Sequence, residues 1–466
     1  MRLDRVVTGM LLALAIFWIG ASAFVRGDGV PDWWLPAALA GGLFTGLATG
    51  RGEPAATSEP TPRWASWTLA ALVAVAFAAL AYGAVATPSR HWDGAASFDA
   101  KVFWLTRAPT LQQPFFEAAG VFHHGPDYPL LQALLVAMAE RLAPGFGRLV
   151  LAMLYLLLVG VAAAALRPRA MPPLVRVALT GCLALTPALL TPGGGAADSG
   201  YSEVALLVAT TTIAGGLLNR STLWFGLGIG LAVVTKPEGA IYAVAAVAVA
   251  FVGGNRRLLV AGFAGLLVAL GTWSPVRAVL LHQPSTSLWW QGLAGATLAC
   301  WAALAATERL PRPAVGRWAL ALAAPLALLL ALPVIAPWFA PESAIGVYMR
   351  QAARWHQGLA NLPDYLAAML AYGITRLRLG LTFVVPLAAL AIARARRAPL
   401  AAGGVGAFLG FGLVSTALPF VLSPEPDLQH HLRSSLPRLL LHWIGPAWLL
   451  TAALLQPWHD QDPPRT

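Results

Sequence analysis

Four short polar stretches interrupt a strongly apolar chain, and each contains residue types that can take part in chemistry. The first begins with His91-Trp92-Asp93-Gly94 and continues to Lys101. Asp93 follows a long apolar run, so we expect it at the membrane boundary, where a poorly solvated carboxylate can accept a proton from a hydroxyl group held against it. Alternatively, Asp93 only caps a helix and Lys101 only extends toward lipid headgroups.

The same stretch contains further polar side chains that could act as a base or bind a ligand. Asp99 is an alternative base, or else a solvated or capping residue. His124 and Asp127 flank a Gly-Pro pair and are followed by Tyr128-Pro129, so two prolines stiffen the backbone and present both polar side chains together. His123, His124 and Asp127 could together bind zinc, but adjacent histidines rarely bind one ion, so we expect no metal.

The second stretch, Thr235-Lys236-Pro237-Glu238-Gly239, breaks an apolar run that extends from Leu223 to Val252. That run is long for one membrane span and short for two, so we expect the break to lie below the outer surface and to line a cavity. Lys236 and Glu238 at membrane depth are costly, which makes a functional site the default hypothesis. An ammonium group suits a lipid phosphate, and a mutual Lys236–Glu238 ion pair is the alternative.

The third stretch, Asp198-Ser199-Gly200-Tyr201-Ser202-Glu203, opens another apolar run. Asp198 or Ser199 is suited to the N-cap of a helix, where a side-chain oxygen accepts hydrogen bonds from backbone N–H groups. Glu203 would fall in the first turn, where the helix dipole stabilises a negative charge. Capping alone would explain these residues, and ligand binding is the alternative.

The fourth stretch runs from Leu428 to Arg438, just before the last apolar run. His431 and Arg438 are seven positions apart, which places them on one face of a helix, although Pro437 argues against an unbroken helix there. Arg438 lies where a phosphate headgroup would be, either as part of a binding site or as an ordinary headgroup contact.

Composition restricts the class of protein that can contain these stretches. Of 466 residues, 58% are hydrophobic and only 11% are charged, whereas a soluble domain carries about 25% charged residues. Apolar runs of roughly 15–25 residues recur along the whole chain, the length that crosses a hydrocarbon layer as a helix. The net charge of +11 lies mostly in short turns between these runs, which indicates membrane orientation rather than nucleic-acid binding.

The sequence predicts an all-α, polytopic transmembrane helical bundle of about 14 spans. Residues 1–63 form N-terminal transmembrane helices, residues 64–455 the main bundle, and residues 456–466 a short polar tail. A large first outer loop, 87–147, carries helices that lie against the membrane surface, with 127–143 as one of them. The predicted spans are 7–25, 33–49, 64–86, 147–166, 174–191, 201–218, 222–235, 239–253, 258–274, 288–307, 318–340, 377–393, 401–422 and 437–455.

The distribution of basic residues predicts the orientation. With the N-terminus inside and the first segment retained as a signal anchor, the turns with clustered arginines all fall on the cytoplasmic side. The outer side then receives the irregular segments with most of the acids and histidines. We therefore expect a site on the extracytoplasmic face, with Asp93, Lys236 and Arg438 around one outward cavity.

Taken together and in order, these stretches resemble those of the GT-C superfamily of integral-membrane glycosyltransferases. The likeness is to bacterial members akin to the protein O-mannosyltransferases and the transferases that decorate lipid A and lipopolysaccharide core. It covers about residues 64–455. The matching elements are Trp92-Asp93 with Lys101, His124-Gly125-Pro126-Asp127-Tyr128-Pro129-Leu130-Leu131, Gly200-Tyr201-Ser202-Glu203, Thr235-Lys236-Pro237-Glu238-Gly239, and His431 with Ser435 and Arg438.

The resemblance implies transfer of a sugar from a polyprenyl-phosphate carrier to a hydroxyl acceptor of the cell envelope, with inversion. Asp93 would be the catalytic base, and Lys236, Arg438 and Lys101 would bind the donor phosphate. It implies the inner membrane as location, contacts with membrane lipids, no nucleic acid and no cofactor. Residues implied in substrate binding are His124, Asp127, Tyr128, Asp198, Glu203, Glu238 and His431.

Two other classes of function compete with a transferase. A transporter or lipid-carrier flippase would also place charges within a bundle, but it predicts inverted repeats and a site at the bilayer midplane. The sequence shows no such repeat, and its polar stretches cluster on one predicted side. A noncatalytic assembly subunit would not gather acids and lysines in one outer cavity.

The two lysines of the chain are expected to differ in importance. Of the 31 lysine and arginine residues, only Lys101 and Lys236 are lysines. We therefore expect that neither is a surface charge that an arginine could replace without effect. Lys236→Ala should weaken donor use strongly, and Lys236→Arg should recover only part of it. Lys101→Ala should have a smaller effect, because we expect its loop to be more open to water and its charge to be better screened.

We predict that Asp93→Asn abolishes sugar transfer while the protein remains folded and inserted. The amide keeps the shape of the carboxylate but cannot take a proton. Asp99→Asn should have a milder effect, and the transfer rate of each purified variant is the measurement. A rate for Asp93→Asn close to that of the wild type would move the role of base to Asp99 or Asp127.

Overall fold

In the part of the chain that it describes, the computed structural model contains helices and no strands, which agrees with the predicted all-α class. The described residues are 3–49, 60–87, 94–117, 128–167, 171–191, 199–280, 353, 358–375, 377–395, 403–422 and 427–455.

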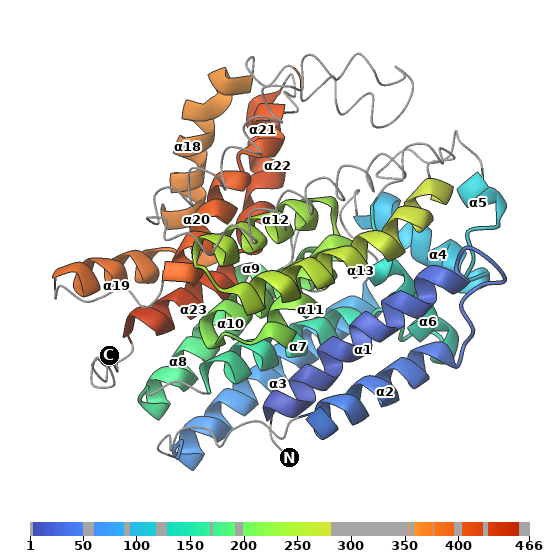
Figure 1. Cartoon of the computed structure of the whole chain (residues 1–466), viewed down its shortest axis with the longest axis horizontal. Helices are drawn as coiled ribbons and strands as arrows, with labels where there is room; N and C mark the ends of the chain where they lie inside the picture. The colour runs from blue at the N-terminus through green and yellow to red at the C-terminus, as the bar shows by residue number, and fades with distance from the viewer. Residues whose placement is uncertain are drawn as a thin grey trace.

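Among the described residues up to 280, the chain forms one π-helix and thirteen α-helices; Figure 1 shows their arrangement. They are α1 (Leu3–Phe24), α2 (Trp34–Thr49), α3 (Arg63–Ala86), π-helix η1 (Gly94–Asp99), α4 (Ala100–Arg107), α5 (Pro114–Glu117), α6 (Leu131–Leu142), α7 (Leu149–Leu166), α8 (Pro173–Ala184), α9 (Pro187–Leu190), α10 (Glu203–Asn219), α11 (Thr222–Thr235), α12 (Pro237–Val252) and α13 (Arg256–Leu280).

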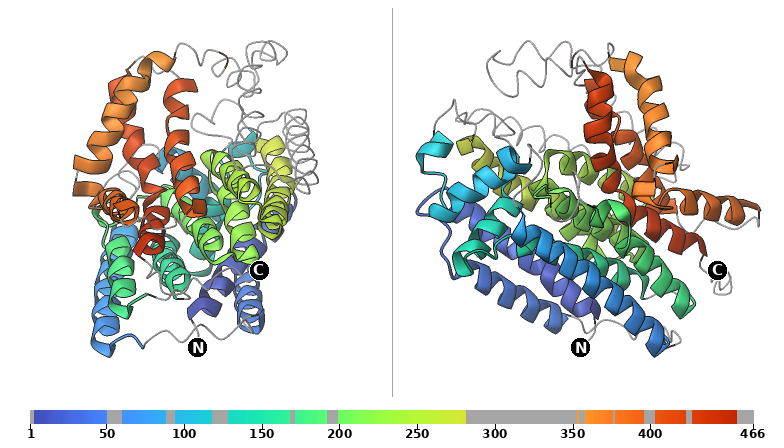
Figure 2. Two further views of the ribbon diagram at one scale, coloured as in Figure 1. Left: turned by 60° about the vertical axis from the view of Figure 1, so that its left-hand side comes forward. Right: turned by 180° about the vertical axis from the view of Figure 1, so that it is seen from behind.

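The C-terminal part contains shorter helices. They are η4 (Leu359–Asn361), α18 (Leu362–Leu370), η5 (Ala371–Thr375), η6 (Leu377–Leu379), α19 (Val384–Ala395), α20 (Gly403–Ser415), α21 (Leu418–Leu422), α22 (Leu428–Leu441) and α23 (Ile444–Leu455). In Figure 1, α18, α21 and α22 stand together above the main bundle, and Figure 2 shows the same arrangement from two other sides.

Most predicted spans within the described residues coincide with helices. The span predicted at 174–191 is divided between α8 and α9, because Pro187 begins a new helix. The span predicted at 377–393 is helical as α19 only from Val384, because η6 and Gly380, with φ +59°, come first. The predicted spans 288–307 and 318–340 lie outside the described residues.

Several helices are suited to a membrane by length and composition. Among the described residues, five helices are long and apolar enough to cross one, or six if α22 and α23, bent by 47°, form one broken span. Apolar helices of 10–17 residues accompany them, among them α2, α10, α11 and α12. The chain is thus a membrane protein, while the count of about 14 spans and the large first loop stay predictions.

The two ends of the helical bundle contain segments that the sequence assigns to opposite sides of the membrane. At one end, Asp4 of α1 pairs with Arg167 at 3.2 Å, and Arg176 donates to the Arg167 carbonyl. Asn219 at the end of α10 donates to the Ala165 carbonyl. The N-terminus therefore lies with arginines that the sequence assigns to the cytoplasmic side.

Segments that the sequence assigns to the outer side meet at the other end. The backbone N–H of Val30 donates to the Pro109 carbonyl, and Asp32 pairs with Arg141 at 2.6 Å. Gln132 at the start of α6 donates to the Gly200 carbonyl just before α10. The loop after α1, the α4–α6 segment and the start of α10 thus share one end, and Figure 1 shows α4, α5 and α6 gathered there.

Glycines allow α1 and α2 to pack backbone against backbone. A Cβ on Gly42 would lie 2.4 Å from the backbone nitrogen of Ala13, and one on Gly46 would lie 2.4 Å from the nitrogen of Gly9. Small residues at such contacts are the usual means of close approach between membrane helices. The position of α2 against α1 therefore depends on these glycines.

We predict that Gly42→Ala lowers the free energy of unfolding by about 1–3 kcal/mol, because the added methyl group overpacks the helix contact. The matched control is Gly41→Ala, since a Cβ at Gly41 meets nothing within 4 Å. Gly41→Ala should leave the stability unchanged or raise it by up to about 1 kcal/mol. Denaturation in detergent measures the free energy of unfolding of each variant. Equal changes in Gly42→Ala and Gly41→Ala would contradict the close contact of Gly42 with α1.

Candidate functional site

Seven of the eleven predicted site residues fall in the described part of the chain. Asp93, His124, Asp127 and Asp198 lie outside the described residues. The other seven are Lys101, Tyr128, Glu203, Lys236, Glu238, His431 and Arg438.

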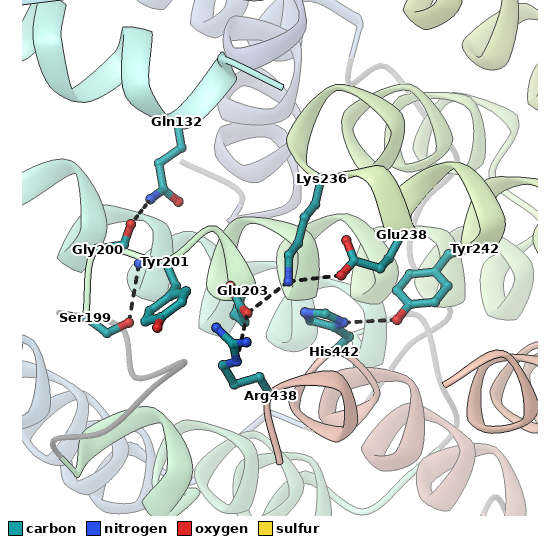
Figure 3. A network of polar contacts seen from close by, with 10 residues as sticks. All are labelled: Gln132, Ser199, Gly200, Tyr201, Glu203, Lys236, Glu238, Tyr242, Arg438 and His442. Carbon is teal, nitrogen blue, oxygen red and sulfur yellow. Dashed lines mark hydrogen bonds and ion pairs between the residues drawn. The ribbon is translucent and has the colours of Figure 1, made fainter. Parts of the chain in front are cut away.

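Three of these residues form an ion-pair network around the carboxylate of Glu203 (Figure 3). Glu203 is the first residue of α10 and has no solvent exposure. Its Oε1 lies 2.9 Å from Nζ of Lys236 and 3.9 Å from Nε of Arg438. The structure thus brings Lys236 and Arg438, distant in sequence, to one carboxylate.

Glu238 completes the network, because its Oε1 lies 3.3 Å from Nζ of Lys236. The sequence suggested Lys236–Glu238 as a mutual pair, but Glu203 is the nearer partner of the lysine. Two carboxylates and two cations balance in this set of four. The second carboxylate oxygens of Glu203 and Glu238 are buried and have no hydrogen-bond partner among the described residues.

The junction between α11 and α12 places Lys236 in this network. Lys236 has extended backbone angles between the two helices, and Pro237 occupies the first position of α12. A Cβ on Gly239 would lie only 1.8 Å from the carbonyl oxygen of Ala232, so α12 starts in direct contact with α11. Lys236 is consequently only 5% exposed.

The helix α22 presents Arg438 to the network. Its N-cap is Asp427, whose side chain accepts a hydrogen bond from the backbone N–H of His430. The helix continues through Pro437 to Leu441, so the proline does not interrupt it, and His431 and Arg438 lie on one helix as their spacing predicts. His431 lies two turns earlier and contacts the ring of Phe420 at 4.7 Å between centroids. His431 is therefore placed beside Phe420, whereas Arg438 contacts Glu203.

A buried histidine that the sequence patterns do not single out lies beside the network. His442 stands at the bend between α22 and α23 and has no solvent exposure. Its Nδ1 lies 3.1 Å from the hydroxyl of Tyr242, and its carbonyl accepts a hydrogen bond from Thr210 at 2.6 Å. Figure 3 shows the ring between Tyr242 and the Glu203–Lys236 pair. The sequence offers only a lone histidine in an apolar run, which usually indicates packing.

The other predicted cation, Lys101, is buried as well. Its side chain is 2% exposed, and Nζ donates to the Tyr128 carbonyl at 3.4 Å. The expectation that Lys101 is open to water is therefore wrong. Screening by solvent is therefore no reason to expect a minor role for Lys101, because it is buried on α4, a helix that packs against α6.

Asp99, the alternative base, forms an ion pair instead of a helix cap. Its carboxylate lies 3.1 Å from the Arg148 guanidinium, and it makes no capping hydrogen bond to α4. Burial raises the pKa of Asp99, although Arg148 acts in the opposite direction. A raised pKa suits a general base near neutral pH, but pairing with Arg148 limits this carboxylate as a proton acceptor.

The candidate metal ligands cannot be assembled from the described residues. Within that part of the chain, no three His, Cys, Asp or Glu side chains are placed to hold a metal ion. His124 and Asp127 lie outside it.

Fold and network together define a helical membrane protein with a buried, charge-balanced cluster at one end of its bundle. Comparison with protein-family models, with curated proteins and with solved structures finds no match for this chain. The resemblance to the GT-C superfamily therefore stays a prediction from the four polar stretches.

We predict that Glu203→Gln lowers the free energy of unfolding by about 3–5 kcal/mol, because it removes the shared partner of two buried cations. The control is Asp32→Asn, which breaks the Asp32–Arg141 pair on an aspartate side chain that is 54% exposed. An exposed pair contributes only about 0–1 kcal/mol.

The exposed Asp32–Arg141 pair should also respond to pH. The hydrogen bond from Arg141 lowers the pKa of Asp32, so any stability from this pair is present above the unfolded pKa and is lost as pH falls through the folded pKa. Equal losses of unfolding free energy in Glu203→Gln and Asp32→Asn at neutral pH would contradict the large contribution expected of the buried Glu203 network.

Proposed function

We propose that this protein is a membrane glycosyltransferase that moves a sugar from a polyprenyl-phosphate carrier to a hydroxyl acceptor of the cell envelope, with inversion. One observation supports it most. Lys236 and Arg438, which the resemblance implies in binding the donor phosphate, meet at the buried carboxylate of Glu203. A site of this kind can stabilise the negative charge that develops on a leaving phosphate.

Within this proposal Arg438 is the cation that first meets the phosphate. Its side chain is 17% exposed, compared with 7% for Lys236, and it lies farther from Glu203. A guanidinium offers five N–H donors, so it can contact Glu203 and a phosphate together. Lys236, held between two carboxylates, fixes the position of Glu203 beside Arg438.

The reaction would be a single displacement at the anomeric carbon. Asp93 takes the proton of the acceptor hydroxyl while the acceptor oxygen bonds to the anomeric carbon. The bond from that carbon to the phosphate oxygen breaks, and polyprenyl phosphate leaves with the electron pair. Arg438, Lys236 and Lys101 balance its charge. A single carboxylate on the acceptor side is consistent with inversion, since retention needs a second one as nucleophile.

We place the site on the extracytoplasmic side of the inner membrane. Support comes from the opposite end of the bundle, where the N-terminus lies with Arg167 and Arg176. Positively charged turns favour the cytoplasm, and the Glu203 network belongs to the end that these arginines do not occupy.

The direct test is incubation of membranes containing the protein with radiolabelled polyprenyl-phosphate sugars. Appearance of label in a lipid, glycan or protein fraction, dependent on this chain, supports the proposal. Movement of intact labelled carrier across proteoliposomes, with no transfer, would support the flippase alternative and reject a transferase.

We predict that Arg438→Ala and Lys236→Ala each lower kcat/KM for the donor by roughly 10²-fold, the effect of removing one positioned donor from a charge-stabilising site. The matched control is Arg433→Ala, on the same helix but exposed. It should leave the rate within about twofold of the wild type, as expected for an isolated surface charge. Equal losses in Arg433→Ala and Arg438→Ala would indicate general damage to α22.

A further inference from the structure

A row of aromatic rings lies between two of the cations proposed to bind the phosphate, Lys101 and Arg438. Phe98, in the π-helix η1, stacks on Tyr128 with 5.9 Å between ring centroids and contacts Tyr201 at 6.3 Å. Both distances are within the range of favourable aromatic pairs. Phe98 is 4% exposed and Tyr201 is 7% exposed, so both rings belong to the protein interior.

A cation lies over the ring at each end of this row. Nζ of Lys101 lies 5.8 Å from the centroid of Tyr128, and the guanidinium of Arg438 lies 4.7 Å from that of Tyr201. Cations over aromatic faces at such distances are attracted to the ring. The order in space is therefore Lys101, Tyr128, Phe98, Tyr201 and Arg438.

The row crosses elements that are far apart in the chain. Phe98 and Lys101 come from η1 and α4, Tyr128 precedes α6, Tyr201 lies two residues before Glu203, and Arg438 comes from α22. Phe98 is the one ring that touches both tyrosines in the described contacts. A π-helix is a rare conformation that often occurs at functional sites, and here it directs Phe98 between them.

We propose that Phe98 is a positioning residue that sets the place of Arg438, through Tyr201, relative to Lys101. This inference rests on the proposed function, in which these cations bind the phosphate of the carrier. Without the ring, Tyr201 loses its support on the side of η1, and the guanidinium that lies over Tyr201 is no longer held at a fixed distance from Lys101. The ring itself touches no reacting atom.

The test is a double-mutant cycle with steady-state transfer assays on the full-length protein, using a radiolabelled polyprenyl-phosphate sugar as donor. Phe98→Leu should raise the donor KM about tenfold, equivalent to roughly 1.4 kcal/mol, with little change in kcat. Phe98→Tyr, which keeps the ring, should restore the wild-type KM. In the Arg438→Ala background, Phe98→Leu should cause no further loss, because residues that act as a unit are not additive.

The matched control is Phe116→Leu, which removes an equally buried ring from α5 that contacts Phe115. It should leave the donor KM unchanged. Independent, multiplicative effects of Phe98→Leu and Arg438→Ala, or an equal KM change in Phe116→Leu, would overturn the inference.

A second measurement separates this inference from the proposed function. Thermal unfolding of Phe98→Leu, Tyr201→Leu and the double variant needs no substrate, and non-additive midpoints would support the contact even if the wild type transfers no sugar. Absence of transfer would then count against the glycosyltransferase alone. Additive midpoints would overturn the positioning role whatever the activity.

Discussion

The carboxylate of Glu203 imposes the strongest physical constraint on this structure. A charge without solvent exposure loses several kcal/mol of hydration, and only close opposite charges in good geometry offset that loss. Lys236 lies 2.9 Å away and Arg438 lies 3.9 Å away. The starts of α10 and α12 and the end of α22 must therefore lie close together around this carboxylate.

Other features of the chain serve the same requirement. The contact of Gly239 with the carbonyl of Ala232 brings α12 close enough for Lys236 to turn inward. The hydrogen bond from Thr210 to the His442 carbonyl fastens the bend after α22 onto α10. The ring of Tyr201 lies beneath the guanidinium of Arg438. These contacts hold the start of α12, the bend after α22 and the guanidinium of Arg438 in place around the network.

Local signals in the sequence predicted most of the helices but not the partners within the site. Apolar runs end at polar residues, and so the bounds of α1, α2, α3, α7 and α11 could be predicted closely. The Lys236–Glu203 pair could not be predicted in this way. Glu238 is the acid nearer to Lys236 in sequence, but its carboxylate lies farther from the lysine than that of Glu203. The burial of Lys101 and of His442 depends on which helices pack together, and local patterns in a single sequence do not specify that packing.

The order in which the charges occur along the chain has a consequence for membrane insertion. Glu203, Lys236 and Glu238 belong to α10 and to the start of α12, which are synthesised close together, whereas Arg438 follows near the C-terminus. Glu203 can pair with Lys236 once the start of α12 follows, 33 residues later, so its charge stays unpaired only while α11 is added. At that stage the group has one excess negative charge, which α22 neutralises when it arrives. The charge balance of the site is therefore completed late in biogenesis, when α22, followed by α23, joins the bundle.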